Sequence, residues 1–71
     1  MLKMGRYRHY KGKEYMVLGV AKHSETLEDL VIYETLYKNK ISKLWARPLV
    51  MFNEEVKVEG KKVWRFKYIG K

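Results

Sequence analysis

The chain has 71 residues, no cysteine and a formal net charge of +8 at pH 7, from 16 lysines and arginines against 8 acidic residues. This length allows one small domain, and without cysteine neither a disulfide framework nor a thiolate metal site can support its core. No stretch approaches about 18 consecutive apolar residues, so no transmembrane helix is predicted. We expect one cytoplasmic domain over residues 1–71, with frayed termini at 1–4 and 70–71.

The first third of the chain predicts two strands. Gly5–Tyr10 alternates between two sets of side chains, and Lys11-Gly12-Lys13 then breaks the pattern, which indicates a strand and a tight turn. Tyr15–Lys22 is rich in β-forming apolar residues and predicts a central strand with both faces mostly covered. Within it, Gly19 allows a bend or a close backbone approach.

The segment Thr26–Tyr37 is compatible with a helix or a strand. Thr26-Leu27-Glu28-Asp29 resembles a capping box, and the apolar residues after it have partly helical spacing. The continuous apolar run Leu30–Tyr33 would surround a helix, whereas in a strand it alternates between two faces. We therefore predict a strand, with Glu25–Asp29 as a hairpin connection.

A turn at Asn39-Lys40 leads to a short predicted strand, Lys43–Arg47. Pro48 ends that strand, because proline lacks a backbone donor and starts a turn well. Residues 48–52 should then form one turn of α- or 3₁₀-helix that places Met51 and Phe52 in the core. Trp45 is also predicted to belong to the core.

Val56–Val58 and Val63–Ile69 predict a final hairpin around Glu59-Gly60. Six short strands and one helical turn describe an all-β domain, a small SH3-like antiparallel roll or barrel in which a strongly bent sheet closes on itself.

Several motifs, spread over nearly the whole chain, resemble a family of small bacterial proteins that is known only as a domain of unknown function. The resemblance implies an SH3-type roll and no particular activity. Its motifs are Gly5-x-Tyr7-x-His9-Tyr10-Lys11-Gly12, Tyr15-x-Val17-x-Gly19-x-Ala21, His23-Ser24-Glu25-Thr26, Val31-x-Tyr33, Leu36-Tyr37, Trp45-x-Arg47-Pro48, Met51-Phe52 and Arg65-Phe66.

The loop His23-Ser24-Glu25-Thr26 contains side chains that could take part in acid–base or nucleophilic chemistry. Neighbouring residues of an extended segment point to opposite sides, however, so they form no relay unless the loop folds sharply. The alternative is a structural turn, in which the Ser24 and Thr26 hydroxyls bond to local backbone and Glu25 accepts from an arginine. We expect no enzyme activity and no cofactor. No metal site is expected either, because His9 and His23 have no ligand spacing.

Charge and aromatic residues favour a binding module. Residues 1–13 and 35–53 carry lysines and arginines but no acid, a distribution that attracts polyanions or simply maintains solubility. Arg47 and Arg65 lie among aromatic residues in the sequence and could bind phosphate or carboxylate, or only cover an aromatic ring. Stacking platforms for unpaired bases, or else core positions, are offered by Tyr7, Tyr10, Tyr33, Tyr37 and Trp45.

We therefore expect nucleic acid, a ribonucleoprotein or an acidic protein as partner, bound through a basic, aromatic-bearing surface. The alternative is a peptide or small acidic ligand at the His23–Thr26 loop together with Arg47. The candidate ligand-binding residues are His9, His23, Ser24, Glu25, Thr26, Tyr33, Trp45, Arg47 and Arg65.

Chain direction gives one further prediction. Two successive hairpins would return Arg47 to the end of the sheet where the strand Tyr15–Lys22 finishes. An Arg47 cluster with Glu25 or His23 is then expected at that rim.

Overall fold

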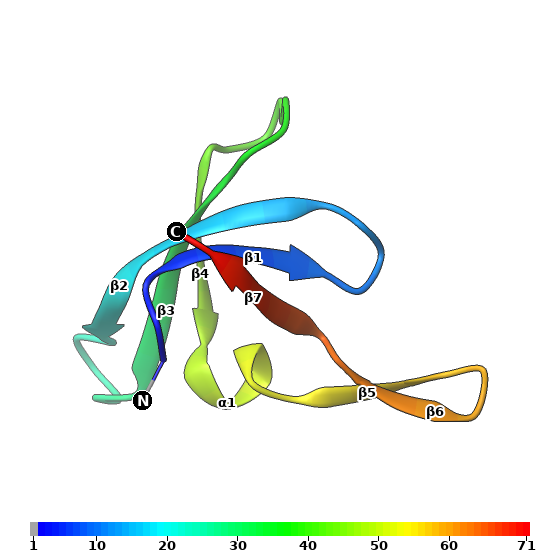
Figure 1. Cartoon of the computed structure of the whole chain (residues 1–71). Helices are drawn as coiled ribbons and strands as arrows, with labels where there is room; N and C mark the ends of the chain where they lie inside the picture. The colour runs from blue at the N-terminus through cyan, green and yellow to red at the C-terminus, as the bar shows by residue number, and fades with distance from the viewer. Residues whose placement is uncertain (1) are drawn as a thin grey trace.

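A computed structural model describes residues 2–71 and contains seven strands and one helical turn (Figure 1). The all-β prediction with a single short helix is confirmed. The elements are β1 (Gly5–His9), β2 (Glu14–Lys22), β3 (Asp29–Thr35), β4 (Leu44–Pro48), α1 (Leu49–Phe52), β5 (Glu55–Val58), β6 (Lys61–Trp64) and β7 (Phe66–Gly70).

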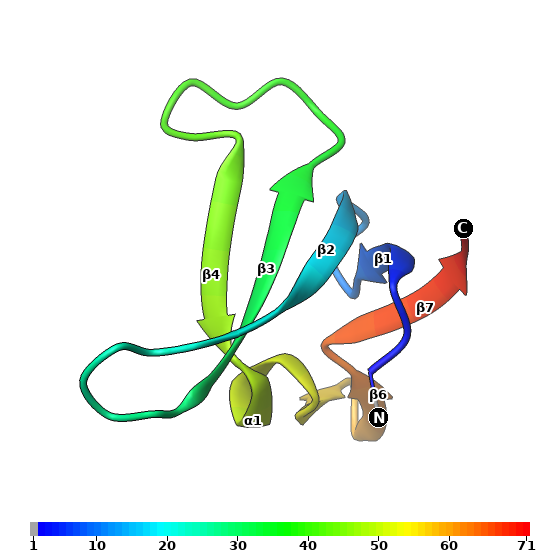
Figure 2. The same cartoon turned by 90° about the vertical axis from the view of Figure 1, so that its left-hand side faces the viewer.

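Five strands form one antiparallel sheet in the order β4-β3-β2-β1-β7, and β5 pairs with β6 in a separate hairpin. The main sheet is strongly twisted, so that β3 and β4 run across the direction of β1 and β7 (Figures 1 and 2). In the part of the chain that the structure describes, β4 and β7 are the two edges, and no ladder joins them. The sheet therefore bends into a roll without closing through hydrogen bonds.

The segment that could have been a helix is strand β3. Its residues pair with β2 from Tyr15↔Thr35 to Lys22↔Asp29, and with β4 from Glu34↔Leu44 to Leu30↔Pro48. Val31, Tyr33 and Thr35 are buried on one face. Pairing with β2 on one side and β4 on the other therefore stabilises this segment as a strand rather than a helix.

The core lies on the inner face of the bent sheet and is largely aromatic. Its buried residues are Tyr7, Val17, Val31, Tyr33, Phe52 and Phe66. Phe52, from α1, is 1 % exposed and stacks on Phe66 with ring centres 4.2 Å apart. Because Pro48 turns the chain, α1 carries Phe52 across the open end of the roll.

Three expectations about side chains and turns need correction. Met51 is 45 % exposed, because a single helical turn directs only one of the two adjacent residues inward. β2 is central, as predicted, but its outer face is not covered: no second layer formed by residues 2–71 lies there, and Leu18 and Val20 are exposed. Of the two roles expected for Gly19, a close backbone approach does not occur, because nothing lies within 4 Å of its Cβ position, whereas the shift of the β2–β3 register beside it agrees with a bend.

The predicted last strand is divided at Arg65 into β6 and β7. The Arg65 amide donates to the Glu54 carbonyl, and the Tyr10 amide donates to the Arg65 carbonyl. These bonds tie the base of the β5–β6 hairpin to β1, while its tip extends away from the sheet (Figure 1). β7 continues to Gly70, one residue beyond the expected end.

Among residues 2–71, no helix has the length and apolar character needed to cross a membrane.

Candidate functional site

The ring of Phe66 is the point at which several polar side chains of the inner face meet. The guanidinium carbon of Arg47 lies 5.5 Å from its centre. The rings of His9 and Tyr15 lie edge-on to it at 5.0 and 5.6 Å. Since β4 places Arg47 opposite the buried Val31, the Arg47 side chain shares the inner face with the core.

His9 is half-buried in this cluster. Its Nδ1 accepts a hydrogen bond from the Lys11 amide at 3.2 Å, so the proton of the neutral ring lies on Nε2. Burial lowers the pKa of His9 below its ordinary value of 6.5, and the positive charges of Arg65, Arg47 and Lys11 lower it further. His9 is therefore a neutral donor at pH 7.

Arg65 is held by a carboxylate. Its Nη2 lies 2.6 Å from Glu54 Oε1, and its Nε donates to the same oxygen at 2.9 Å. This contact fixes the break between β6 and β7. Arg65 thus has a structural partner, whereas Arg47 has no ion pair or side-chain hydrogen bond with any of residues 2–71.

Tyr15 adjoins Phe66, and Tyr37 adjoins Tyr15. The hydroxyl oxygens of Tyr15 and Tyr37 lie 3.1 Å apart and share a hydrogen bond. Burial raises the pKa of Tyr15 above its ordinary value of 10.0, and the bond to Tyr37 adds to the rise. Trp45 packs against the core, and its Nε1 donates to the Ser42 carbonyl at 3.0 Å.

The His23–Thr26 loop is occupied with its own backbone. His23 Nδ1 accepts from the amides of Glu25 and Thr26 at 3.1 and 3.3 Å, and Thr26 Oγ1 accepts from the Glu28 amide. Leu27 adopts a left-handed conformation, with φ of 62°, to close the turn. Thr26 thus bonds to local backbone, as the structural-turn alternative predicted. The acceptor role of His23 in this turn was not predicted. Ser24 and Glu25 are exposed and make no side-chain bond to any of residues 2–71.

Arg47 returns to the end of β3 next to this loop, as the topology predicted, but the rim cluster does not form. Arg47 pairs in register with Val31, two residues from the start of β3. Within residues 2–71, no ion pair or hydrogen bond joins it to His23 or Glu25. Its side chain is directed to Phe66 on the inner face instead. The predicted site residues thus divide into an inner-face group (His9, Tyr33, Trp45 and Arg47), Arg65 at the break between β6 and β7, and the separate loop.

Tyr33 cannot serve as an accessible platform. It is 5 % exposed, and its ring packs on Tyr15, Phe52 and Phe66. Tyr7 is buried to the same degree. For these two tyrosines the core interpretation is correct, because alternation directs both to the covered face of the sheet.

A groove of about 540 Å³ lies between the β1–β2 turn, β7 and the β5–β6 hairpin. Two exposed aromatic residues line it, Tyr10 and Trp64, with exposed fractions of 39 and 55 %. The cations Arg8, Lys62 and Lys67 line the same groove. We call these five residues the basic groove.

Cross-strand register places like charges side by side at the basic groove. Arg8 is the direct partner of Lys67 on β1 and β7, and Lys57 is the direct partner of Lys62 on β5 and β6. Directly opposed like charges destabilise a sheet. Glu14 relieves Arg8 through an exposed ion pair at 3.0 Å, but Lys57, Lys62 and Lys67 have no carboxylate partner within residues 2–71.

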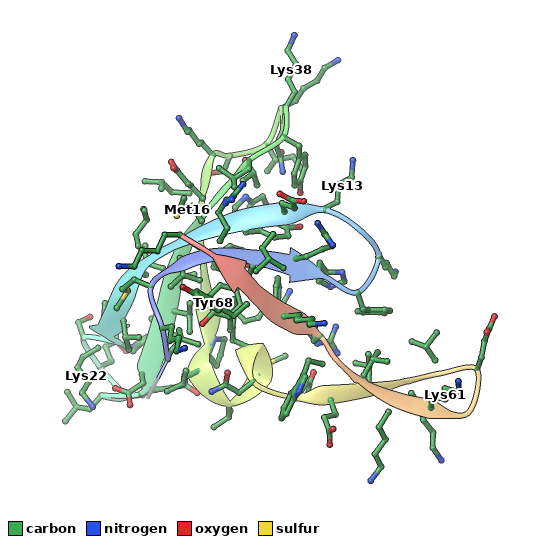
Figure 3. The ribbon with its side chains drawn as sticks, in the orientation of Figure 1. Lys13, Met16, Lys22, Lys38, Lys61 and Tyr68 are labelled. Atoms are coloured by element: carbon green, nitrogen blue, oxygen red, sulfur yellow. The ribbon has the colours of Figure 1, made fainter. Side chains whose placement is uncertain are left out.

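Trp64, an aromatic residue of this groove, was not among the candidate site residues, because no sequence signal distinguished it from its neighbours. Trp64 alternates with Phe66 and Tyr68 in the chain, so all three looked equivalent. The break at Arg65 separates them: Phe66 and Tyr68 face inward on β7, while Trp64 stays exposed on the hairpin (Figure 3 labels Tyr68).

In the described part of the chain, no group of three or more His, Asp or Glu side chains is arranged to hold a metal ion. Nδ1 of each histidine accepts hydrogen bonds from backbone amides, of Lys11 for His9 and of Glu25 and Thr26 for His23.

Comparisons with known proteins agree with the fold. A crystal structure of a DUF1653 protein from Bordetella bronchiseptica is similar to this chain, with a TM-score of 0.93 and 39 % sequence identity over 97 % of this chain and 88 % of that one. No curated protein matches the sequence. The model of the family described as "Protein of unknown function (DUF1653)" matches residues 5–68, and this chain belongs to that family.

Proposed function

We propose that this domain is a non-catalytic binding module for single-stranded nucleic acid, which it holds in the basic groove. The observation that supports this most directly is the exposure of Trp64 and Tyr10 among Arg8, Lys62 and Lys67. Nonspecific binders of single strands combine cations that follow the phosphates with aromatic rings on which bases stack. The groove offers both, on a scaffold made rigid by the aromatic core.

The opposed cation pairs give an energetic reason for a polyanion. Without a ligand, Lys57 and Lys62 repel one another across the hairpin, and Lys67 lies opposite Arg8, whose charge is offset by its ion pair with Glu14. Phosphates placed between them would replace repulsion by attraction. A net charge of +8 would also increase the rate of encounter with such a ligand.

Fluorescence anisotropy with labelled oligouridylate and oligothymidylate tests the proposal. If three groove cations each contact one phosphate, the log–log dependence of affinity on salt should have a slope of about −2, from about −0.7 per phosphate. Trp64→Ala should weaken binding at least about fivefold, because base–aromatic stacking contributes about 1–3 kcal/mol. Ile41→Ala, which also removes an exposed apolar side chain but lies in the 36–43 loop, should bind normally.

The charge test compares two double variants with the same change in net charge. Lys57→Glu/Lys62→Glu alters the hairpin, and Lys38→Glu/Lys40→Glu alters the distant 36–43 loop; Figure 3 shows Lys38 and Lys61 at different ends of the molecule. Only the hairpin variant should lose most of the binding. Equal losses in both variants, or no binding even at low salt, would overturn the proposal.

A further inference from the structure

Arg47 differs from the other arginines of this chain in its surroundings. Arg8 is paired with Glu14 and Arg65 with Glu54, whereas Arg6 is fully on the solvent side of β1. Arg47 is half-buried on the aromatic face, yet its guanidinium has no carboxylate or carbonyl partner within residues 2–71. A guanidinium presents rigidly spaced donors that suit a carboxylate or phosphate.

Phe66 holds this guanidinium in place. Arg47 lies 5.5 Å from the centre of the ring, and the ring itself is fixed by its stack on Phe52. A cation on an aromatic ring is attracted to it without using its N–H donors. The N–H donors of the Arg47 guanidinium are therefore positioned before any ligand arrives, which lowers the entropy cost of binding.

The neighbouring polar groups on Phe66 are hydrogen-bond donors. In the Tyr15–Tyr37 pair one hydroxyl donates to the other, which leaves one O–H hydrogen without a partner in that pair. His9 has its Nδ1 engaged by the Lys11 amide, so its Nε2 carries a proton. Arg47, His9 and Tyr15 all contact the same ring, at 5.5, 5.0 and 5.6 Å from the centre of Phe66, which places the three groups close to one another.

We propose that the inner face of the sheet carries a second binding site, in which Arg47, with the Tyr15–Tyr37 hydroxyl pair and His9, receives the oxyanion of a small carboxylate or phosphate ligand. His9 also lines the groove that contains the basic groove residues, but Arg47, Tyr15 and Tyr37 do not, so the anion-binding fork of this site lies outside it. Arg8 and Lys67 are side-chain neighbours on the outer face of β1 and β7, whereas His9 and Phe66, the next residues along, are paired on the inner face.

The pKa of His9 reports on ligand binding at Arg47. If Arg47 had only a structural role, adding an anion would leave this pKa unchanged. Arg65, Arg47 and Lys11 are the charged groups whose fields lower its pKa, in addition to burial. An oxyanion beside Arg47 opposes these positive charges and raises the pKa of His9. The imidazole signals of His9 and His23 can be followed together by NMR, and His23, in the separate loop, serves as the internal control.

The test titrates the protein with inorganic phosphate and, separately, with benzoate, at constant ionic strength set by chloride. We expect saturable shifts at His9, Tyr37 and the Arg47 Nε–H, with a raised His9 pKa and an unchanged His23. Arg47→Lys, which retains the charge but loses the fork, should weaken binding about tenfold or more. Tyr37→Phe retains the ring and should also weaken it, whereas Arg6→Gln should not.

Comparison of the two probes distinguishes a carboxylate site from a phosphate site. The hairpin variant Lys57→Glu/Lys62→Glu should bind the small anions normally. The proposed nucleic-acid site and the proposed anion site can therefore be disproved separately. Shifts that do not saturate, that appear equally at His23, or that survive Arg47→Lys unchanged in a protein with a normal thermal melt would overturn the proposal.

Discussion

The hydroxyl oxygens of Tyr15 and Tyr37, 22 positions apart in the chain, lie 3.1 Å apart at the end of the β2–β3 pair. Their rings also meet edge-on, with centres 5.6 Å apart. This contact attaches the start of the 36–43 loop to the central strand. It makes the loop's first turn part of the folded inner face.

Removing one member of this pair should cost stability. Tyr37→Phe leaves the partly buried Tyr15 hydroxyl without its partner, which we expect to lower the free energy of unfolding by about 1–2 kcal/mol. The double variant Tyr15→Phe/Tyr37→Phe removes both polar groups and should be less destabilised than the sum of the two single variants. Urea denaturation of the full double-mutant cycle measures this, and strict additivity would show that the hydroxyls do not interact.

Phe52 and Met51 are neighbours in α1 with opposite roles. Phe52→Ala should unfold the domain or lower its stability by about 3–5 kcal/mol, because it empties the space next to Phe66. Met51→Ala should change stability by less than about 1 kcal/mol, since the side chain is exposed. Trp45→Ala should lie between them, because Trp45 is half-buried and loses its bond to Ser42. Thermal melts of the three variants give the order, and a stable Phe52→Ala would show that the core is misassigned.

Gly5 is required at the β1–β7 junction. It has φ of +133°, and a Cβ there would lie 2.7 Å from the Gly70 carbonyl oxygen. Gly5→Ala should therefore destabilise the domain by well over about 1 kcal/mol, since neither the backbone conformation nor the space suits alanine. Gly19→Ala is the matched control, because nothing lies within 4 Å of its Cβ position. Equal melting temperatures for the two variants would contradict this reading of β7.

His9 should make stability depend on pH below neutrality. Because its folded pKa lies below the ordinary 6.5, the unfolded chain takes up the proton first as the pH falls. The stabilising contribution is therefore complete above about pH 6.5 and is lost as the pH falls through the folded pKa of His9. The difference between the denaturant midpoints of the wild type and His9→Gln should be largest and constant above about pH 6.5, and it should decrease as the pH falls below that value. A constant difference across this range would rule out His9 as the source.

Much of this fold follows from the sequence. Alternating apolar residues and strong turn signals predicted every strand segment, and Pro48 predicted the single helical turn, because these features act through local backbone sterics and the period of two. The order of consecutive hairpins also placed Arg47 at the end of the sheet next to the His23 loop. The local sequence, however, did not predict that Arg65 divides the last strand. The break depends on backbone hydrogen bonds that join Arg65 to Glu54 and to Tyr10, which lie in other segments of the chain.

Sequence alone therefore determined the all-β class, the strand segments, the basic character and the set of residues able to bind an anion. Tertiary structure decided which of those residues share a surface. Tyr33 and Trp64 look alike as alternating aromatic residues, yet only packing against Phe52 and Phe66 buries the first, and only the departure of the β5–β6 hairpin exposes the second. Arg47 is directed to Phe66 rather than to Glu25 because the bend of the sheet brings Phe66 of β7 within 5.5 Å of the Arg47 guanidinium on β4, a long-range relationship that local pattern does not encode.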